Sequence, residues 1–234
     1  MCGRYALTAD RRAIIDEFGA RLADDLDPLH VTERYNIAPT QPVAVIVPQT
    51  EGRLLTAMRW GIVPQWMKPE AGGKPPAGWI NARAETAADK PAFHGAFKYR
   101  RCLVPASGFY EWAKRDGSKQ PYYVRSAEDR LLAFAGLWET WTPPDGSELD
   151  TVTILTTEPN AMMAELHDRL PVVLDPGDYD RWMATPPEEA ESLTELLRPA
   201  PDGTLSKTPV SRRVNSPKHD DPACLERAGG KLWE

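Results

Sequence analysis

Apolar positions along this chain fall in short runs that are bounded by Gly, Pro or Asp-Gly signals, the pattern of β-strands joined by tight turns. The Asp116-Gly117 pair predicts a hairpin turn between two of these runs. We therefore expect strands at Val43–Val47, Leu54–Trp60, Cys102–Pro105, Phe109–Trp112, Tyr122–Arg125, Leu131–Trp138 and Thr151–Thr156.

Helical spacing is confined to a few segments. Ile14, Ile15, Phe18 and Leu22 share one face of a helix predicted over Asp10–Leu22, with Thr8 as its cap. Further along the chain we expect helices at Asn160–Leu166, Asp178–Met183 and Glu188–Leu197, and then an extended piece at Thr208–Val214.

Many short strands with a few helices predict an α+β fold around a strongly bent antiparallel sheet or barrel-like core with flanking helices. The length of 234 residues and a hydrophobic content of 41% allow one large domain or two small ones. No repeat or clear break divides the chain, so we expect a single domain over residues 1–234, with a core at about 2–215 and a polar tail at about 216–234. The Pro/Gly-rich segment Met67–Gly78 is expected to be a long loop, either functional or a tolerated surface insertion.

Composition narrows the classes of function. No apolar stretch follows the first residues and no run approaches a membrane span, so we expect a cytoplasmic protein with no membrane partner. The cysteines and histidines lack disulfide or zinc spacing, which predicts no metal and no cofactor. The net charge of −6 excludes a uniformly basic surface but leaves room for a local basic groove. Candidate basic clusters are Lys98, Arg100 and Arg101, and Arg212 with Arg213, although such clusters are usually only solvated surface.

Cys2 has a chemistry that depends on its position. Methionine aminopeptidases remove Met1 before a small residue, and the chain would then begin with a 1,2-aminothiol. Such a group condenses with an aldehyde, first as an imine through the amine and then as a thiazolidine ring through the thiol. At pH 7 roughly 10–20% of an α-amine is neutral, against roughly 0.04% of an ordinary Lys amine. Cys2 is thus a candidate nucleophile that needs no buried lysine.

Seven short sequence motifs, called words below, occur in order along the chain and support a family relationship. They are Met1–Tyr5 (MCGRY), Arg34–Thr40 (RYNIAPT), Arg59–Trp66 (RWGIVPQW), Ile80–Thr86 (INARAET), Gly108–Trp112 (GFYEW), His167–Leu174 (HDRLPVVL) and Pro209–Val214 (PVSRRV). From residue 2 to about residue 215 these words resemble the SRAP family, which is named for SOS-response-associated peptidases.

The resemblance implies a single SRAP domain that captures abasic sites in single-stranded DNA covalently. It implies that Cys2 is the nucleophile and that Asn81 holds the N-terminal amine or a sugar-derived oxygen. Glu111 would act as general acid and base in opening the deoxyribose ring and forming the imine. His167 would hydrogen-bond the sugar hydroxyl and assist proton transfer, including reversal of the crosslink. The chemistry itself calls for such groups, because ring opening and loss of water both need a proton donor.

The resemblance also implies DNA contacts, in which arginines pair with phosphates and exposed Trp stacks on bases. The matching positions are Arg4, Asn36, Pro39, Trp66, Arg83, Trp112 and Arg212, with Lys90 and Thr156 as weaker candidates. Bacterial members can carry a Trp-Trp pair, whereas Trp66 is followed here by Met67, which places a second stacking surface in doubt. We expect Trp60, Trp138 and Trp141 to be core residues, and we expect a monomer that is associated with the nucleoid when bound to DNA.

Two other functions fit the same residues. The first is a cysteine peptidase with Cys2 as nucleophile and Glu111 and His167 assisting, for which the bond after its own Met1 is one candidate substrate. The second is a non-covalent reader of single-stranded DNA or modified bases, whose binding would be salt-dependent and independent of Cys2.

Overall fold

The structure, a computed structural model, describes residues 2–24, 26, 32–115 and 118–229. The N-terminal half contains the elements β1 (Tyr5–Leu7), α1 (Arg11–Phe18), β2 (Ala20–Leu22), β3 (Arg34–Ile37), β4 (Pro42–Gln49), β5 (Gly52–Trp60), β6 (Asn81–Arg83), α2 (Ala84–Ala87), α3 (His94–Tyr99), β7 (Arg101–Ala106) and β8 (Gly108–Arg115). The C-terminal half contains β9 (Ser118–Ser126), β10 (Leu132–Trp141), β11 (Leu149–Thr157), α4 (Ala161–Ala164), β12 (Leu170–Pro171), β13 (Val173–Leu174), α5 (Tyr179–Ala184) and β14 (Leu205–Pro209).

A closed barrel forms the centre of the molecule. The strands β4, β5, β11, β10 and β7 pair in a ring, antiparallel everywhere except between β5 and β11. That parallel contact joins Arg59 to Thr151 and Trp60 to Val152, and it closes the ring. Closure removes the free edges that an open sheet would expose. The expected α+β fold with a barrel-like core is therefore confirmed.

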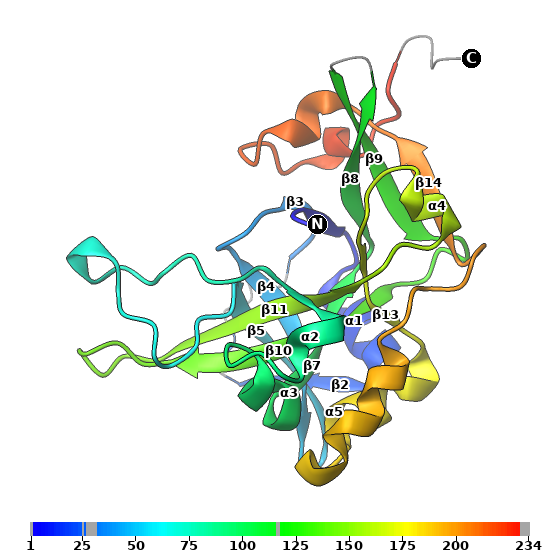
Figure 1. Ribbon diagram of the computed structural model, residues 1–234. Helices are drawn as coiled ribbons and strands as arrows, with labels where there is room; N and C mark the ends of the chain where they lie inside the picture. The colour runs from blue at the N-terminus through cyan, green and yellow to red at the C-terminus, as the bar shows by residue number, and fades with distance from the viewer. Residues whose placement is uncertain (1, 25, 27–31, 116–117, 230–234) are drawn as a thin grey trace.

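A second, antiparallel sheet stands over the barrel in the order β14-β9-β8-β1-β3 (Figure 1). Strands β8 and β9 pair from Phe109↔Val124 to Arg115↔Ser118. The turn predicted at Asp116-Gly117 lies outside the described residues. The first strand, β1, lies between β3 and β8, so the start of the chain is held inside this sheet rather than at its edge.

The strand predictions are confirmed, because each of the seven apolar runs overlaps an observed strand. The short strands β1, β3 and β6 and the helices α2 and α3 were not predicted. The three strands, of three or four residues each, are too short to show an alternation of their own.

The first helix was predicted too long. It spans Arg11–Phe18 and not Asp10–Leu22, because Gly19 adopts a left-handed φ of 55° and ends it. The residues after this cap form β2. The predicted cap was also wrong: the Asp10 side chain accepts a hydrogen bond from the Ala13 amide at 2.8 Å, whereas Thr8 contacts Ser107.

The later helical predictions hold in part. Asn160 caps α4, and α5 begins at Tyr179, in agreement with two of the predicted helices. The segment predicted as a helix at Glu188–Leu197 is a 3-10 helix over Pro187–Leu196. The extended piece predicted at Thr208–Val214 corresponds to β14, which ends at Pro209 before a 3-10 turn at Arg212–Asn215.

The polar segment after residue 215 does not behave as a tail in its described part. Cys224 is fully buried, and the Asp220 carboxylate accepts hydrogen bonds from the backbone of β3. Figure 1 shows this red segment beside β3 and the β8–β9 hairpin. Composition was misleading because the polar side chains bind the protein rather than water. Among the described residues, no helix is long and apolar enough to cross a membrane.

The loop from Gly61 to Gly78 is tied to the barrel by buried tryptophans. The predicted core positions Trp60 and Trp141 are both buried, and their indole N–H groups donate to the Ile80 and Met67 carbonyls at 2.9 and 2.8 Å. The third, Trp138, is half-buried and packs against the core.

The two glycines at the ends of this loop, Gly61 and Gly78, cross in close contact. A Cβ on Gly61 would lie 2.4 Å from the Ala77 carbonyl oxygen, and one on Gly78 would lie 2.5 Å from the Gly61 oxygen. Both have positive φ, 127° and 71°. The crossing allows Ile62 and Trp79 to pair, with reciprocal hydrogen bonds of 3.1 Å. It thereby sets the path of the chain into β6.

We expect Gly61→Ala to lower the free energy of unfolding by about 1–3 kcal/mol, because it strains φ and forces two backbone segments apart. Denaturant unfolding would measure the change. The control is Gly177→Ala, since Gly177 has no neighbour within 4 Å of an added Cβ and no positive φ. Equal stability of the two variants would contradict the role given to this crossing.

Candidate functional site

Cys2 lies immediately before β1 and only 1% of its surface is exposed. Its thiol donates to the Arg4 carbonyl at 3.7 Å, and its own carbonyl accepts a hydrogen bond of 2.9 Å from the Asn81 side-chain amide. Burial raises the pKa of the Cys2 thiol well above its usual range, and the negative charge of Glu111 raises it further. The sulfur is therefore a protonated thiol in this environment.

Asn81 comes from the barrel. It begins β6, which pairs in parallel with β11 at Asn81↔Ile154. Its amide N–H reaches Cys2, whereas its Oδ1 atom is buried with no hydrogen-bond partner among the described residues. A buried acceptor without a donor costs free energy. This oxygen is therefore suited to accept a hydrogen bond from a bound group.

Glu111 occupies β8 between Tyr110 and Trp112. Alternation along the strand turns its side chain to the opposite face from its two aromatic neighbours, and only 3% of it is exposed. Burial raises the pKa of the Glu111 carboxyl above its usual range, and the charge of His167 acts in the opposite direction. The result is a carboxyl group that retains its proton to a higher pH than an exposed glutamate.

His167 follows α4 and is held by its backbone, which donates to the Met163 carbonyl at 2.8 Å. Its Nδ1 atom lies 3.0 Å from the Arg169 amide and 2.8 Å from an Asp168 carboxylate oxygen. A ring nitrogen cannot accept and donate at once. The neutral ring accepts from Arg169 and carries its proton on Nε2, while the protonated ring can donate to Asp168.

A cavity of about 360 Å³ is lined by two of the predicted catalytic residues, Glu111 and His167, and by Trp112, which was predicted to contact DNA. Lys119 and Asn215 also line it. This volume lies within the range of small-ligand sites, about 300–1,000 Å³. Cys2 and Asn81 do not line the cavity, but the Arg4 carbonyl that accepts the Cys2 thiol also accepts the Tyr110 amide at 3.0 Å, which places Cys2 beside the strand segment that carries Glu111. The structure thus brings the four predicted catalytic residues into one neighbourhood.

Lys119 and Asn215 were missed as site residues. Lys119 lies on β9, three positions before the apolar run that predicted this strand. Asn215 directly follows the PVSRRV word. In the sequence, both residues lie next to segments that had been predicted, and this was the only available signal for them. Lys119 reaches the cavity because β9 pairs with β8, and Asn215 reaches it because the segment after β14 contacts Trp112.

The predicted DNA contacts divide into surface and interior positions. Arg83, Arg212 and Trp66 are exposed, Lys90 is also exposed, and Arg4, Pro39 and Trp112 are half-buried. Asn36 is fully buried and its amide is bound to backbone carbonyls and to Arg4, so it supports the site from inside rather than contacting DNA. Thr156 is likewise buried.

Trp66 has an aromatic neighbour that the sequence did not reveal. The Trp79 ring lies 6.0 Å from it, and the exposed fractions of the two side chains are 63% and 38%. The second aromatic surface that Met67 does not provide therefore comes from the far side of the loop.

The basic cluster at residues 98–101 is not a groove for phosphates. Arg101 is buried and donates to backbone carbonyls, including those of Phe97 and Trp182, and Arg100 pairs with Glu139. Of the other cluster, Arg213 pairs with Asp221 and Arg212 remains exposed.

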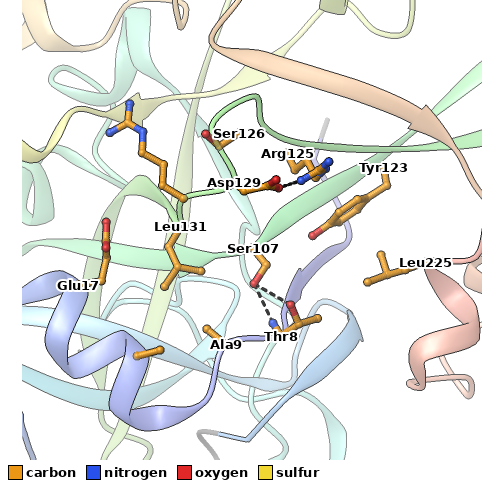
Figure 2. Close-up of a pocket in the computed structure, with 12 residues that line it drawn as sticks. Thr8, Ala9, Glu17, Ser107, Tyr123, Arg125, Ser126, Asp129, Leu131 and Leu225 are labelled. Atoms are coloured by element: carbon orange, nitrogen blue, oxygen red, sulfur yellow. Dashed lines mark hydrogen bonds and ion pairs between the residues drawn. The ribbon is translucent and has the colours of Figure 1, made fainter.

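A second hollow of about 450 Å³ lies between α1 and β9 (Figure 2). Its side chains are already paired: Ser107 accepts from Thr8, and Arg125 forms an ion pair with Asp129. It contains none of the residues predicted for catalysis or DNA contact. The candidate site is therefore the cavity at Glu111 and His167.

Comparisons with known proteins agree on one family. Residues 1–217 match the family model described as SOS response associated peptidase (SRAP). The chain is 37% identical over 227 residues to the abasic site processing protein YoqW of Bacillus subtilis (strain 168), an alignment that covers 97% of this chain and 99% of that protein. It is 36% identical over 195 residues to the abasic site processing protein HMCES of Gallus gallus, covering 74% of this chain and 57% of that protein.

Solved structures share the fold. A protein from Bacteroides thetaiotaomicron superimposes with a TM-score of 0.84 at 23% identity, covering 97% of this chain and all of that chain (100%). A protein from Bordetella bronchiseptica gives a TM-score of 0.75 at 26% identity, with 90% of this chain and 100% of that chain covered.

We expect Glu111→Gln to stabilise the protein at pH 8 and not below pH about 4. Because burial raises the folded-state pKa of Glu111, ionisation of the carboxyl costs the native state more than the unfolded chain, whose glutamate pKa is about 4.3. That cost appears as the pH rises through the folded-state pKa, and Gln never incurs it. Thermal unfolding at both pH values should give a Tm higher by at least about 2 °C at pH 8 only.

The matched control for this comparison is the exposed Glu188→Gln, for which we expect the same Tm difference from the parent protein at both pH values. A Glu111→Gln variant that is less stable than the parent protein at pH 8 would contradict the electrostatic account of the site.

Proposed function

This chain belongs to the SOS response associated peptidase (SRAP) family, and from that premise we propose that it processes abasic sites in single-stranded DNA by forming a covalent adduct through Cys2. The observation that carries the proposal is that Glu111 and His167 line one cavity while Cys2, bound to Asn81, lies close to Glu111, although these residues come from segments far apart in the sequence. The names of the relatives, abasic site processing proteins, point to the same substrate.

The reaction balances without a cofactor. Removal of Met1, which lies outside the described residues, frees the amine of Cys2. The amine adds to the aldehyde carbon of the ring-opened abasic sugar, and the carbinolamine loses water to give an imine. The sulfur then adds to the imine carbon while the thiol proton passes to the nitrogen. The net change is aldehyde plus aminothiol giving thiazolidine plus water.

Glu111 acts as the general acid and base in this proposal. Ring opening of the closed abasic sugar transfers a proton from its hydroxyl group, and imine formation requires a proton on the departing water. A carboxyl group whose pKa is raised by burial holds its proton to a higher pH than an exposed glutamate, so it can act as acid and then as base. The proton on Nε2 of neutral His167 is suited to donate to a sugar hydroxyl in the same cavity.

The state of the thiol favours attack by the amine first. Cysteine peptidases use a thiolate whose pKa is lowered by a neighbouring cation. Here burial and the Glu111 charge raise the pKa of the Cys2 thiol instead. A protonated sulfur is a poor initial nucleophile but can close a ring on an imine already formed beside it. Asn81, which binds the Cys2 carbonyl, would hold the amine in place during both steps.

The DNA strand would be guided by exposed side chains near the cavity. Arg83 ends β6, the strand that Asn81 begins, and is exposed for contact with a phosphate. The Trp66 and Trp79 rings offer faces on which bases can stack. Single strands are favoured over duplexes in this proposal, because stacking and access to the lesion both require unpaired bases.

We expect the protein with Cys2 at its N-terminus to form an adduct with an abasic single-stranded oligonucleotide that survives denaturation. Cys2→Ala should abolish this adduct, because no sulfur remains to close the ring. Cys2→Ser should leave at most a labile imine, which borohydride reduction would trap. The bands are separated on denaturing gels and identified by intact mass, which should show the loss of one water.

Cys102→Ala is the control for cysteine loss, since Cys102 is buried in the barrel strand β7, and it should react like the parent protein. If Cys2→Ala forms a denaturation-resistant adduct as well as the parent protein does, the proposed chemistry is wrong. Salt-sensitive binding without any adduct would instead indicate a non-covalent reader.

We expect Met1 to be removed from the parent protein and equally from Glu111→Ala and His167→Ala, because the raised pKa of the Cys2 thiol does not suit a peptidase nucleophile. Intact mass of the purified proteins measures this directly. Retention of Met1 in either variant, with normal removal in Cys102→Ala, would support self-cleavage and the peptidase alternative.

A further inference from the structure

The Asp220 carboxylate binds the edge of the second sheet. Its Oδ1 atom accepts the backbone N–H groups of Tyr35 and Asn36 at 2.5 and 2.8 Å, and Oδ2 accepts from the Arg34 guanidinium. These donors belong to β3, the outer strand of that sheet. Asp220 thus takes the place of a neighbouring strand at an edge that would otherwise end in unpaired amides. It lies beyond residue 217, where the family match ends.

The strand that Asp220 holds carries a fully buried side chain, Asn36. The Asn36 amide nitrogen donates to the carbonyls of Val214, Ser216 and His219, at 3.2, 3.0 and 2.7 Å. Its oxygen accepts from Arg4 Nη1 at 2.7 Å. Asn36 therefore joins the C-terminal segment to a residue two positions after Cys2.

Arg4 is held by the same C-terminal segment. Its Nη1 also donates to the Val214 carbonyl at 2.9 Å, and its own carbonyl accepts the Cys2 thiol and the Tyr110 amide. The guanidinium is thus held through Nη1 by Asn36 and Val214 and through Nη2 by the Asn215 carbonyl at 3.4 Å, while the residue is only half-buried. A cation held in this way is oriented before a phosphate arrives.

The segment also reaches the other side of the cavity. Asn215 lines it, and the Asn215 side-chain oxygen accepts from the Trp112 indole at 2.7 Å. Trp112 is the neighbour of Glu111 on β8. One short segment, residues 214–220, therefore contacts the chain beside the nucleophile and the chain beside the acid.

We propose that Asp220 is a positioning residue for capture of the abasic site, acting through Asn36 to fix the Arg4 guanidinium that binds a DNA phosphate next to the lesion. The inference rests on the proposed function. Without the carboxylate, the amides of Tyr35 and Asn36 lose their acceptor and Arg34 loses its partner. The 214–220 segment then keeps the Asn36 side-chain hydrogen bonds but loses its bonds to the β3 backbone and to Arg34, so that Arg4 is held less firmly although every catalytic group remains.

The test measures adduct formation on an abasic oligonucleotide over a range of DNA concentrations for Asp220→Ala and Asp220→Asn. We expect Asp220→Ala to lower the rate of capture at limiting DNA by roughly tenfold or more, with a smaller change at saturating DNA. Asp220→Asn keeps an oxygen for the two backbone amides and should restore most of the rate.

Asp221→Ala is the matched control. Asp221 is the adjacent carboxylate and pairs with Arg213, away from β3, so its removal should leave capture unchanged. Thermal unfolding of each variant checks that the native fold is present. Should Asp220→Ala fail to fold, Asp220→Ser takes its place, since its shorter side chain cannot bridge Arg34 and the two backbone amides.

A double variant separates positioning from general stability. If Asp220 acts through Arg4, the rate of Asp220→Ala with Arg4→Ala should equal that of Arg4→Ala alone. Capture by Asp220→Ala at the parent rate would overturn the inference while leaving the proposed function intact. The same holds if the fold-loss of rate in the double variant equals the product of the fold-losses in the two single variants. Absence of any adduct in the parent protein would instead overturn the proposed function.

Discussion

The hydrogen bond from the Asn81 amide to the Cys2 carbonyl joins the two sheets of this protein at the point where its chemistry is proposed. Asn81 belongs to the closed barrel through β6 and β11, and Cys2 lies three residues before the first residue of β1, the strand that pairs with β8 and β3. Because a barrel is a rigid frame without free edges, a residue attached to it is a fixed reference for the segment that precedes β1. The position of the proposed nucleophile thus depends on barrel closure.

Burial gives the site its chemical character. Glu111 and the Cys2 thiol are both removed from water, and burial raises the pKa of each. The charge of the Glu111 carboxylate also raises the pKa of the Cys2 thiol. Such an arrangement is unfavourable for stability, because an ionised group in the interior loses its hydration. It suits a reaction in which protons are held and passed on.

The C-terminal segment shows how polar residues can organise a site without taking part in it. Asp220, Asn36 and Arg4 form a connected set of hydrogen bonds between β3, the segment after β14 and the start of the chain. Fully satisfied polar networks of this kind fix one arrangement among many, because each partner left alone would be costly. Three segments that are distant in the sequence are thereby held in one fixed arrangement.

The sequence by itself determined the fold class, seven of the strands and the identity of the candidate chemical groups. Apolar alternation is a local property, and the ordered words carry the family resemblance residue by residue. It could not determine where the first helix ends, because a helical pattern continued past Gly19 into residues that pair with β5.

Only the tertiary structure decided which residues meet. Asn36 matched a family word but lies inside the protein, Asn215 and Lys119 matched nothing and line the cavity, and the polar segment around Asp220 packs against β3. The pairing of Trp66 with Trp79 likewise depends on the crossing of two glycines. These are contacts between segments far apart in the chain, and their geometry follows from barrel closure and strand register, which no local pattern encodes.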